Sequence, residues 1–299
     1  MINISPRQLE VFVAIATTGS VRAASMQVHL TQPAASMALA ELERQLGAPL
    51  FDRAQRRLRL NAYGRHLLPL AQEVLERLRE IAGADSNASG QMTGELRLGA
   101  SNTVGNYLVG DLLGAFVAGN EKVAVRLHVD NTAAILAGVL DFSLDLGCIE
   151  GPATHSDLRV LPWRSDELRV CAPASHPLAR RKRLRPEHFA GARWILRETG
   201  SATRTQAERA LALLPEGETV LELDQSEAIK QAVIAGLGLA LLPAVSVEHA
   251  LASGRLAVLP TPFLPLSRPL SFVLHRRRHR DALLKAFLAS VGISADAVD

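Results

Sequence analysis

Three short amphipathic segments, each followed by a turn signal, occupy the first 47 residues of the chain. Residues 6–18 have apolar side chains at helical spacing, Pro6 suits a first helical turn, and Gly19 ends the segment. A shorter segment, Ser20–Val28, and a third, Thr31–Gly47, follow with their own start and stop signals. Helices this short are marginal in isolation, so the sequence predicts a compact unit of three helices that share one core.

The third predicted helix begins with small polar side chains. Thr31 suits the capping position, Pro33 suits the first turn, and Gln32 and Ser36 follow on the same helix. Short side chains at a helix N-terminus allow close approach to DNA, and a glutamine can form two hydrogen bonds with one base edge. Taken alone, these residues are better explained as a capped helix end that faces water.

An arginine-rich ribbon follows this helix. Four arginines occur within seven residues, and leucines alternate with the last two: Arg53, Arg56, Arg57, Leu58, Arg59 and Leu60. The alternation predicts a small hairpin with its leucines inward and its arginines exposed, which suits phosphate contacts and insertion into a minor groove. A run of charges is usually only a solvated face. Directly after three short helices, however, it predicts the wing of a winged helix-turn-helix that spans residues 1–61.

Residues 62–86 are mostly strong helix formers and predict a linker helix. Its apolar positions alternate between four- and three-residue spacings, which is typical of a two-stranded coiled-coil seam: Leu67, Ala71, Val74, Leu78 and Ile81. Pro69 is expected to kink this helix or to mark the end of a preceding turn. Because residues 1–61 already have a core, we expect the helix to pair with a second copy of the chain, although packing within its own domain is the alternative. The small polar residues 87–93 are typical of a hinge.

From residue 94 to residue 299, strand-like segments alternate with helical ones. This alternation predicts an α/β domain with a parallel sheet and helices on both faces, including one helix from about Thr103 to Ala118. The alternation forms two series, so we expect a subdomain I of residues 94–166 and 270–299 and a subdomain II of residues 167–269. Two α/β subdomains crossed by two chain segments resemble a periplasmic-binding-protein fold.

Hydroxyl side chains occur at two predicted strand-to-helix junctions. Ligands of α/β proteins bind at the carboxyl ends of the strands, and free amides and hydroxyls at a helix N-terminus form an anion site. A nearby arginine adds a bidentate partner for a carboxylate or an oxyanion. Helix capping is an equally good interpretation of the hydroxyls. The candidate effector contacts are Ser101, Asn102, Thr103, Ser201, Thr203 and Arg204.

The N-terminal pattern resembles the LysR-type transcriptional regulators. The marks that carry the resemblance lie within residues 20–64 and include Leu30–Ala34, Ser36, Leu46-Gly47, Leu50-Phe51 and Arg53. The resemblance implies a regulator that binds double-stranded DNA at a pseudo-palindromic promoter site. Met37 stands where the family often has arginine or lysine, so one DNA contact is expected to differ. The candidate DNA contacts are Thr31, Gln32, Pro33, Ser36, Arg53, Arg56 and Arg57.

The C-terminal part is similar to the branch of this family that contains regulators of sulfur assimilation and carbon fixation. The shared segments include residues 105–108, 131–132, 144–147 and 229–233. The resemblance implies a homodimer formed through the linker helix, a tetramer, RNA polymerase as a further partner, and a small anionic effector. That effector would be an inorganic oxyanion, a carboxylate or a phosphorylated metabolite. Thr132 joins the candidate effector contacts, and Ala202 replaces a usual glycine, which would crowd a ligand.

Other classes of protein lack support in the sequence. No nucleophile-elbow, P-loop, HExxH or paired-cysteine motif occurs, so we expect neither an enzyme nor a metal site or cofactor. Cys148 and Cys171 lie in apolar runs and predict buried thiols. The chain begins without a secretory signal and contains no membrane-spanning apolar run, which predicts a cytoplasmic location. The net charge of +3 is too small to indicate nucleic acid by itself. The alternative is a cytoplasmic small-molecule-binding protein, similar to solute-binding proteins, without regulatory DNA binding.

Overall fold

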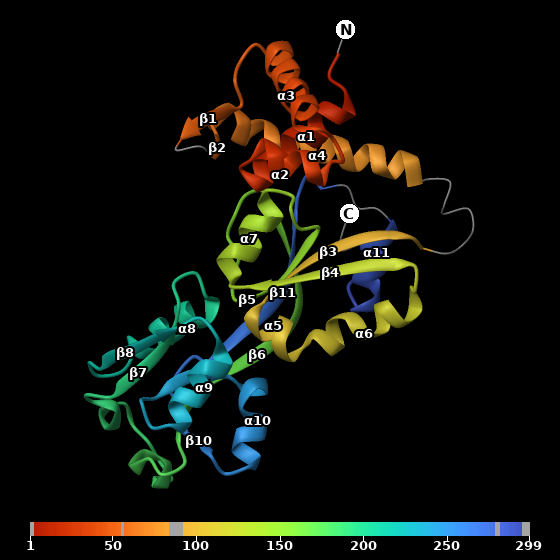
Figure 1. The fold of residues 1–299 in the computed structure, drawn as a ribbon. Helices are drawn as coiled ribbons and strands as arrows, with labels where there is room; N and C mark the ends of the chain where they lie inside the picture. The colour runs from red at the N-terminus through yellow and green to blue at the C-terminus, as the bar shows by residue number, and fades with distance from the viewer. Residues whose placement is uncertain (1–2, 55–56, 84–91, 279–281, 295–299) are drawn as a thin grey trace. The chain divides into compact units, whose positions relative to one another are not determined.

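The chain divides into two compact units, Met1–Gln91 and Met92–Asp299. The structure is a computed structural model that describes residues 3–54, 57–83, 92–278 and 282–294 (Figure 1). Most of the predicted hinge, residues 87–91, and the last residues of the predicted linker helix, 84–86, lie outside the described residues.

The first unit contains the predicted helices and hairpin. Each of the first three helices begins at a serine or threonine whose side chain accepts a hydrogen bond from a backbone amide two or three positions into the helix: Ser5, Ser20 and Thr31. Gly19 and Gly47 end two of these helices with φ values of 67° and 73°, in the left-handed region that glycine tolerates. The elements are α1 (Pro6–Thr18), α2 (Val21–Gln27), α3 (Gln32–Leu46), β1 (Phe51–Ala54), β2 (Arg57–Leu60) and α4 (Ala62–Gly83).

One apolar core joins the three helices to the hairpin. Phe12, Ala24 and Leu42 are fully buried, and the rings of Phe12 and Phe51 meet edge to face at 5.7 Å. Burial of side chains the size of Phe12 and Leu42 contributes about 1.5–3 kcal/mol each. The predicted core of residues 1–61 is therefore present.

The linker helix α4 has two apolar faces rather than one. Ala71 and Leu75 are buried in the core of the first unit. The exposed apolar side chains instead lie at Leu70, Val74, Leu78 and Ile81, which are 39%, 46%, 37% and 72% exposed. The predicted seam was therefore wrong at Ala71, because the helix uses that face for its own unit. The helix also continues through Pro69 without ending there.

The second unit is built on a seven-stranded sheet that both subdomains share. The strand order is β10-β6-β11-β5-β3-β4, and β9 also pairs with β6. β3 runs parallel to β4 and β5, but β11 runs antiparallel to both β5 and β6. The prediction of a parallel sheet was wrong at these crossing strands, because β11 returns the chain from subdomain II to subdomain I. The strands are β3 (Gly94–Ser101), β4 (Val123–Asp130), β5 (Leu146–Glu150), β6 (Leu158–Pro173), β9 (Ala240–Pro243), β10 (Leu256–Val258) and β11 (Ser267–His275).

The remaining elements pack around this sheet (Figure 1). β7 (Arg193–Arg197) and β8 (Glu218–Leu223) form a parallel pair in subdomain II. The helix predicted from Thr103 to Ala118 is divided at Leu108, where the backbone leaves the helical conformation with φ of −118° and ψ of 10°. The helices are α5 (Asn102–Tyr107), α6 (Val109–Gly119), α7 (Thr132–Leu140), α8 (Ala202–Leu211), α9 (Ser226–Ile234), α10 (Ala244–Ala252) and α11 (Ala282–Ser290).

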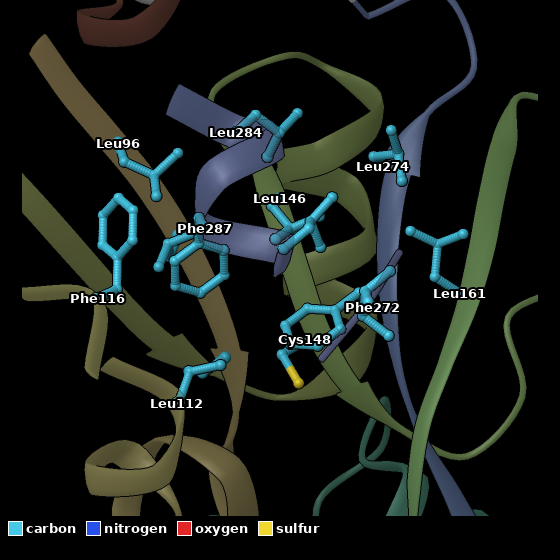
Figure 2. Close-up of a cluster of buried hydrophobic side chains, with 14 of the residues drawn as sticks. Leu96, Leu112, Phe116, Leu146, Cys148, Leu161, Phe272, Leu274, Leu284 and Phe287 are labelled. Atoms are coloured by element: carbon cyan, nitrogen blue, oxygen red, sulfur yellow. The ribbon is translucent and has the colours of Figure 1, made fainter. Parts of the chain in front are cut away.

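Aromatic contacts hold the C-terminal helix against subdomain I. Figure 2 shows Phe287 of α11 among the leucines of this cluster, close to Phe116 and Phe272. The ring of Phe287 meets those of Phe116 and Phe272 edge to face at 5.2 and 6.2 Å. Cys148 lies in the same cluster, and it and Cys171 are free, buried thiols as predicted. Burial raises the pKa of Cys171 to about 12, so this thiol is inert at neutral pH.

Candidate functional site

The outer face of α3 carries the small polar side chains that the sequence singles out. Gln32, Pro33 and Ser36 are exposed, whereas Ala35 and Leu39 are buried on the opposite face. Thr31 is also exposed, and its hydroxyl accepts a hydrogen bond from the Ala34 amide at 3.4 Å. Capping and access to a ligand are therefore compatible at Thr31. Next to this polar face, Met37 is 73% exposed.

The hairpin after α3 has the predicted alternation. Arg53 pairs with Leu58 across the antiparallel ribbon, and Arg57 pairs with Ala54. Leu58 packs against the core while Arg59 is exposed, and the Leu58 amide donates to the Gly19 carbonyl at 3.1 Å. These contacts attach the hairpin to the end of α1. Arg56 and the side chains of Arg53 and Arg57 lie outside the described part of the chain.

In the second unit, a buried ionic cluster lies where the two subdomains meet. Arg268 of β11 faces Asp166 of β6 across the antiparallel pair, and Glu150 ends the neighbouring strand β5. The Arg268 guanidinium contacts Glu150 at 2.7 Å and Asp166 at 2.6 Å. The side chains of Arg268, Glu150 and Asp166 are 1%, 2% and 11% exposed. Such a cluster is stable only if its hydrogen-bonding groups find partners.

Two threonines supply those partners, one from each subdomain. The Thr103 amide donates to Glu150 Oε1 at 2.6 Å, and the Thr203 hydroxyl donates to Glu150 Oε2 at 3.1 Å. Arg268 in turn donates to the Thr103 and Thr203 hydroxyl oxygens at 3.0 and 2.8 Å. With one bond to Glu150 and two to Asp166, all five N–H groups of Arg268 are used.

The Glu150 carboxylate therefore occupies donors of Thr103 and Thr203, two of the predicted effector contacts. Burial by itself raises the pKa of Glu150, but the Arg268 guanidinium and the Thr103 hydrogen bonds outweigh it and hold that pKa below its ordinary value. The carboxylate is consequently charged at neutral pH. Its stabilising contribution is present above the unfolded-state pKa and is lost as the pH falls through the lowered folded-state pKa.

A pocket of about 180 Å³ lies beside this cluster. The N-terminal turns of α7 and α8 border it, and the Ala133 amide donates to the Gly200 carbonyl across the subdomain junction at 3.1 Å. Arg209 of α8 lines the pocket and has no acidic partner among the described residues. The lining residues are Thr132, Ala133, Leu136, Gly151, Pro152, Gly200, Ala202, Thr205, Gln206, Arg209 and Arg268.

The predicted effector contacts fall into separate groups. Thr132 lines the pocket, and Ser101 is 1% exposed with a hydroxyl oxygen that has no hydrogen-bond partner in the described structure. Asn102 and Ser201 are buried at helix starts. Arg204 does not fit its predicted role, because its guanidinium is paired with Glu208 and Glu222 and donates to a backbone carbonyl. Those bonds, the one to Glu208 first, raise the pKa of Arg204.

Three residues of this site were missed: Glu150, Arg209 and Arg268. Glu150 ends β5 and Arg268 is the second residue of β11, so the pairing of two strands distant in the sequence brings them together. Arg209 lies four residues after Thr205 and seven after Ala202 on α8, so helical spacing places these three pocket residues on one face. Within the described residues, no group of metal-ligating side chains occurs. None of the described helices is long and apolar enough to cross a membrane.

Both units match known families. Residues 6–65 match the bacterial regulatory helix-turn-helix of the lysR family, and residues 89–293 match the LysR substrate binding domain. The uncharacterised HTH-type transcriptional regulator YeiE of Escherichia coli is 39% identical over 287 residues, 96% of each chain. The HTH-type transcriptional regulator CbbR of Sinorhizobium medicae is 34% identical over 289 residues, 96% of this chain and 92% of that protein.

Solved structures share the fold. A full-length OxyR variant of Pseudomonas aeruginosa superposes with a TM-score of 0.80 at 24% identity, covering 99% of this chain and 97% of that one. The regulatory domain of CcmR from Synechocystis, solved in complex with 2-PG, gives a TM-score of 0.62 at 27% identity over 67% of this chain and 96% of that one. The family matches set aside the alternative of a small-molecule-binding protein without DNA binding.

The buried cluster predicts an asymmetric response to substitution. Arg268→Met leaves two buried carboxylates without their counter-charge, so we expect it to lower the free energy of unfolding by about 3–5 kcal/mol. Adding Glu150→Gln should restore part of that loss, because one uncompensated charge is removed. Urea unfolding monitored by tryptophan fluorescence measures this, since both tryptophans, Trp163 and Trp194, lie in the second unit. Additive losses in the double variant would contradict the coupling.

Proposed function

Because the chain belongs to the LysR family of DNA-binding transcriptional regulators with an effector-binding domain, we propose that a small anion controls its activity. The pocket beside Arg268 carries this proposal, because residues of both subdomains line it. A ligand that contacts both subdomains at once changes the free-energy difference between their open and closed arrangements. Such a ligand is therefore able to act as an effector.

The charges around the pocket favour an anion. Its lining includes Arg209 and neither aspartate nor glutamate, while the charge of the lining Arg268 is already offset by Glu150 and Asp166. The N-termini of α7 and α8 add positive dipole ends, and Ser201 makes no side-chain cap at the start of α8. A volume of about 180 Å³ suits an inorganic oxyanion or a small carboxylate or phosphorylated metabolite. The 2-PG complex of the related CcmR regulatory domain supports a small effector.

Binding would alter the ionic cluster at the junction. An anion in the pocket lies next to Arg268, whose guanidinium is already saturated by Glu150, Asp166 and the two threonines. The anion would compete with Glu150 for that guanidinium. A change at Arg268 would reach both subdomains through the crossing strands β6 and β11. Effector binding and the subdomain angle would thus be coupled.

DNA recognition in this proposal uses the exposed face of α3 and the hairpin that follows it. The α3 N-terminus would lie in a major groove with Gln32 and Ser36 toward the bases, while the ribbon arginines contact phosphates. The exposed stripe of α4 would form the dimer contact through Leu70, Val74, Leu78 and Ile81. Twofold symmetry then implies a pseudo-palindromic promoter site. Assembly as a tetramer, contact with RNA polymerase and a cytoplasmic location complete the proposal.

The two DNA-contact groups should respond differently to substitution. Gln32→Ala is expected to cost about 1–3 kcal/mol at one half-site position and to relax base preference there, because a base-edge contact is lost. Arg56→Ala should instead weaken binding to all sequences. It should also reduce the slope of the logarithm of the binding constant against the logarithm of salt concentration by about one, because one phosphate contact is lost. Titrations of a selected site and a random duplex at several salt concentrations measure both effects. Equal losses on specific and random DNA in both variants would refute the assigned roles.

The effector pocket predicts a selective loss of anion binding. Inorganic oxyanions and small organic acids should raise the Tm of the full-length protein where one of them binds, since a ligand stabilises the state that binds it. Arg209→Gln should abolish that rise because a cation of the pocket without an acidic partner is removed. Arg193→Gln is the matched control, being an exposed arginine of the same subdomain outside the pocket lining. A stabilisation that persists unchanged in Arg209→Gln would locate the effector elsewhere.

A further inference from the structure

A dense group of positive side chains lies in subdomain II, in the segment between β6 and β7. Five cations occur within six residues: Arg180, Arg181, Lys182, Arg183 and Arg185. All five are exposed. In Figure 1 this segment, drawn in green, lies at the end of the second unit distant from α6 and α11. We call it the basic segment.

The basic segment is attached firmly at its base. Leu184 is 7% exposed and Phe189 is fully buried, with the Phe189 ring stacked on Trp194 at 6.0 Å. Short 3-10 turns flank the arginines at Pro177–Arg180 and Pro186–Phe189. The backbone that carries the five cations is therefore already ordered before a ligand binds. Binding through these side chains consequently loses less conformational entropy than binding through a free tail.

Nothing in the described structure neutralises these charges. No ion pair joins any of the five to an acidic side chain of the described residues, and Arg181 approaches only the His188 ring nitrogen, at 3.5 Å. Removing the five cations and Glu187 from the count changes the net charge of the chain from +3 to −1. The basic segment together with Glu187 thus carries a net charge of +4. Mutual repulsion of five like charges is unfavourable unless a polyanion binds them.

The composition of the basic segment favours a phosphate backbone over a protein surface. Protein interfaces depend on buried aromatic or apolar anchors, but the apolar side chains here, Leu184 and Phe189, are already buried within the domain. Four of the five cations are arginines, whose planar groups pair with phosphate through two hydrogen bonds.

We propose that the basic segment is a second DNA-contact surface, which binds phosphates that flank the site read by α3. The inference rests on the proposed DNA recognition by α3. Because the family is one of DNA-binding regulators, DNA is the polyanion that every bound copy already holds at high local concentration. The contact carries no sequence information. It strengthens binding to long duplexes and makes that binding more sensitive to salt.

The test compares salt dependence on two lengths of DNA. The full-length triple variant Arg181→Gln/Lys182→Gln/Arg183→Gln removes three charges from the basic segment. The matched control Lys122→Gln/Arg193→Gln/Arg277→Gln removes three exposed charges scattered over the same unit. Each protein is titrated with duplexes of about 20 and about 60 base pairs that carry one centred site, selected from a random pool by the wild-type protein.

On the long duplex, the slope of the logarithm of the binding constant against the logarithm of salt concentration should be smaller in magnitude by about 2–3 for the triple variant than for the wild type. The control should change this slope far less. On the short duplex the variant should match the wild type, which also shows that it folds. Equal slopes for the triple variant and the control on the long duplex would overturn the proposal. Unchanged DNA binding with loss of transcription in a reaction with purified RNA polymerase would overturn it too, in favour of an acidic protein surface.

Discussion

The Arg268 guanidinium is the interaction on which the arrangement of the second unit depends. Its five N–H groups bind groups from β5, β6, α5 and α8, and thus from both subdomains. A buried arginine is costly unless every donor is paired, so the position of each partner is determined by the others. In this structure those contacts join the two subdomains at the junction. In the proposed mechanism, a ligand that competes for the guanidinium would change these contacts.

This view changes what the hydroxyl-bearing helix starts do. The N-terminus of α5 already holds an anion, the carboxylate of Glu150, so the protein carries its own ligand in the place expected for an effector. An effector then has to offer more than charge, because it competes with a carboxylate that has no association entropy to lose. In the proposed mechanism, the adjoining pocket would supply the additional contacts from Arg209 and two helix dipoles. In this proposal, the differential affinity needed for regulation would arise from this competition.

The sequence was sufficient where local chemistry decides the structure. Ser5, Ser20 and Thr31 cap the helices that the periodicity predicts, and the hairpin alternation places Leu58 inward. It was insufficient where partners come from distant positions. Arg268 and Glu150 are 118 residues apart, and Arg204 pairs with Glu222 from another element. The α4 seam shows the same limit, since periodicity identifies an apolar stripe but not whether Ala71 packs on its own unit or on a partner.

Calorimetric titration of the Glu150→Gln variant tests the competition most directly. An anion that stabilises the wild-type protein should bind the full-length variant at least several-fold more tightly, because the amide no longer competes as a charge for Arg268 while it keeps an acceptor for the Thr103 amide. An affinity equal to or weaker than that of the wild type would show that Glu150 does not compete with the effector, and the account of the junction would be wrong.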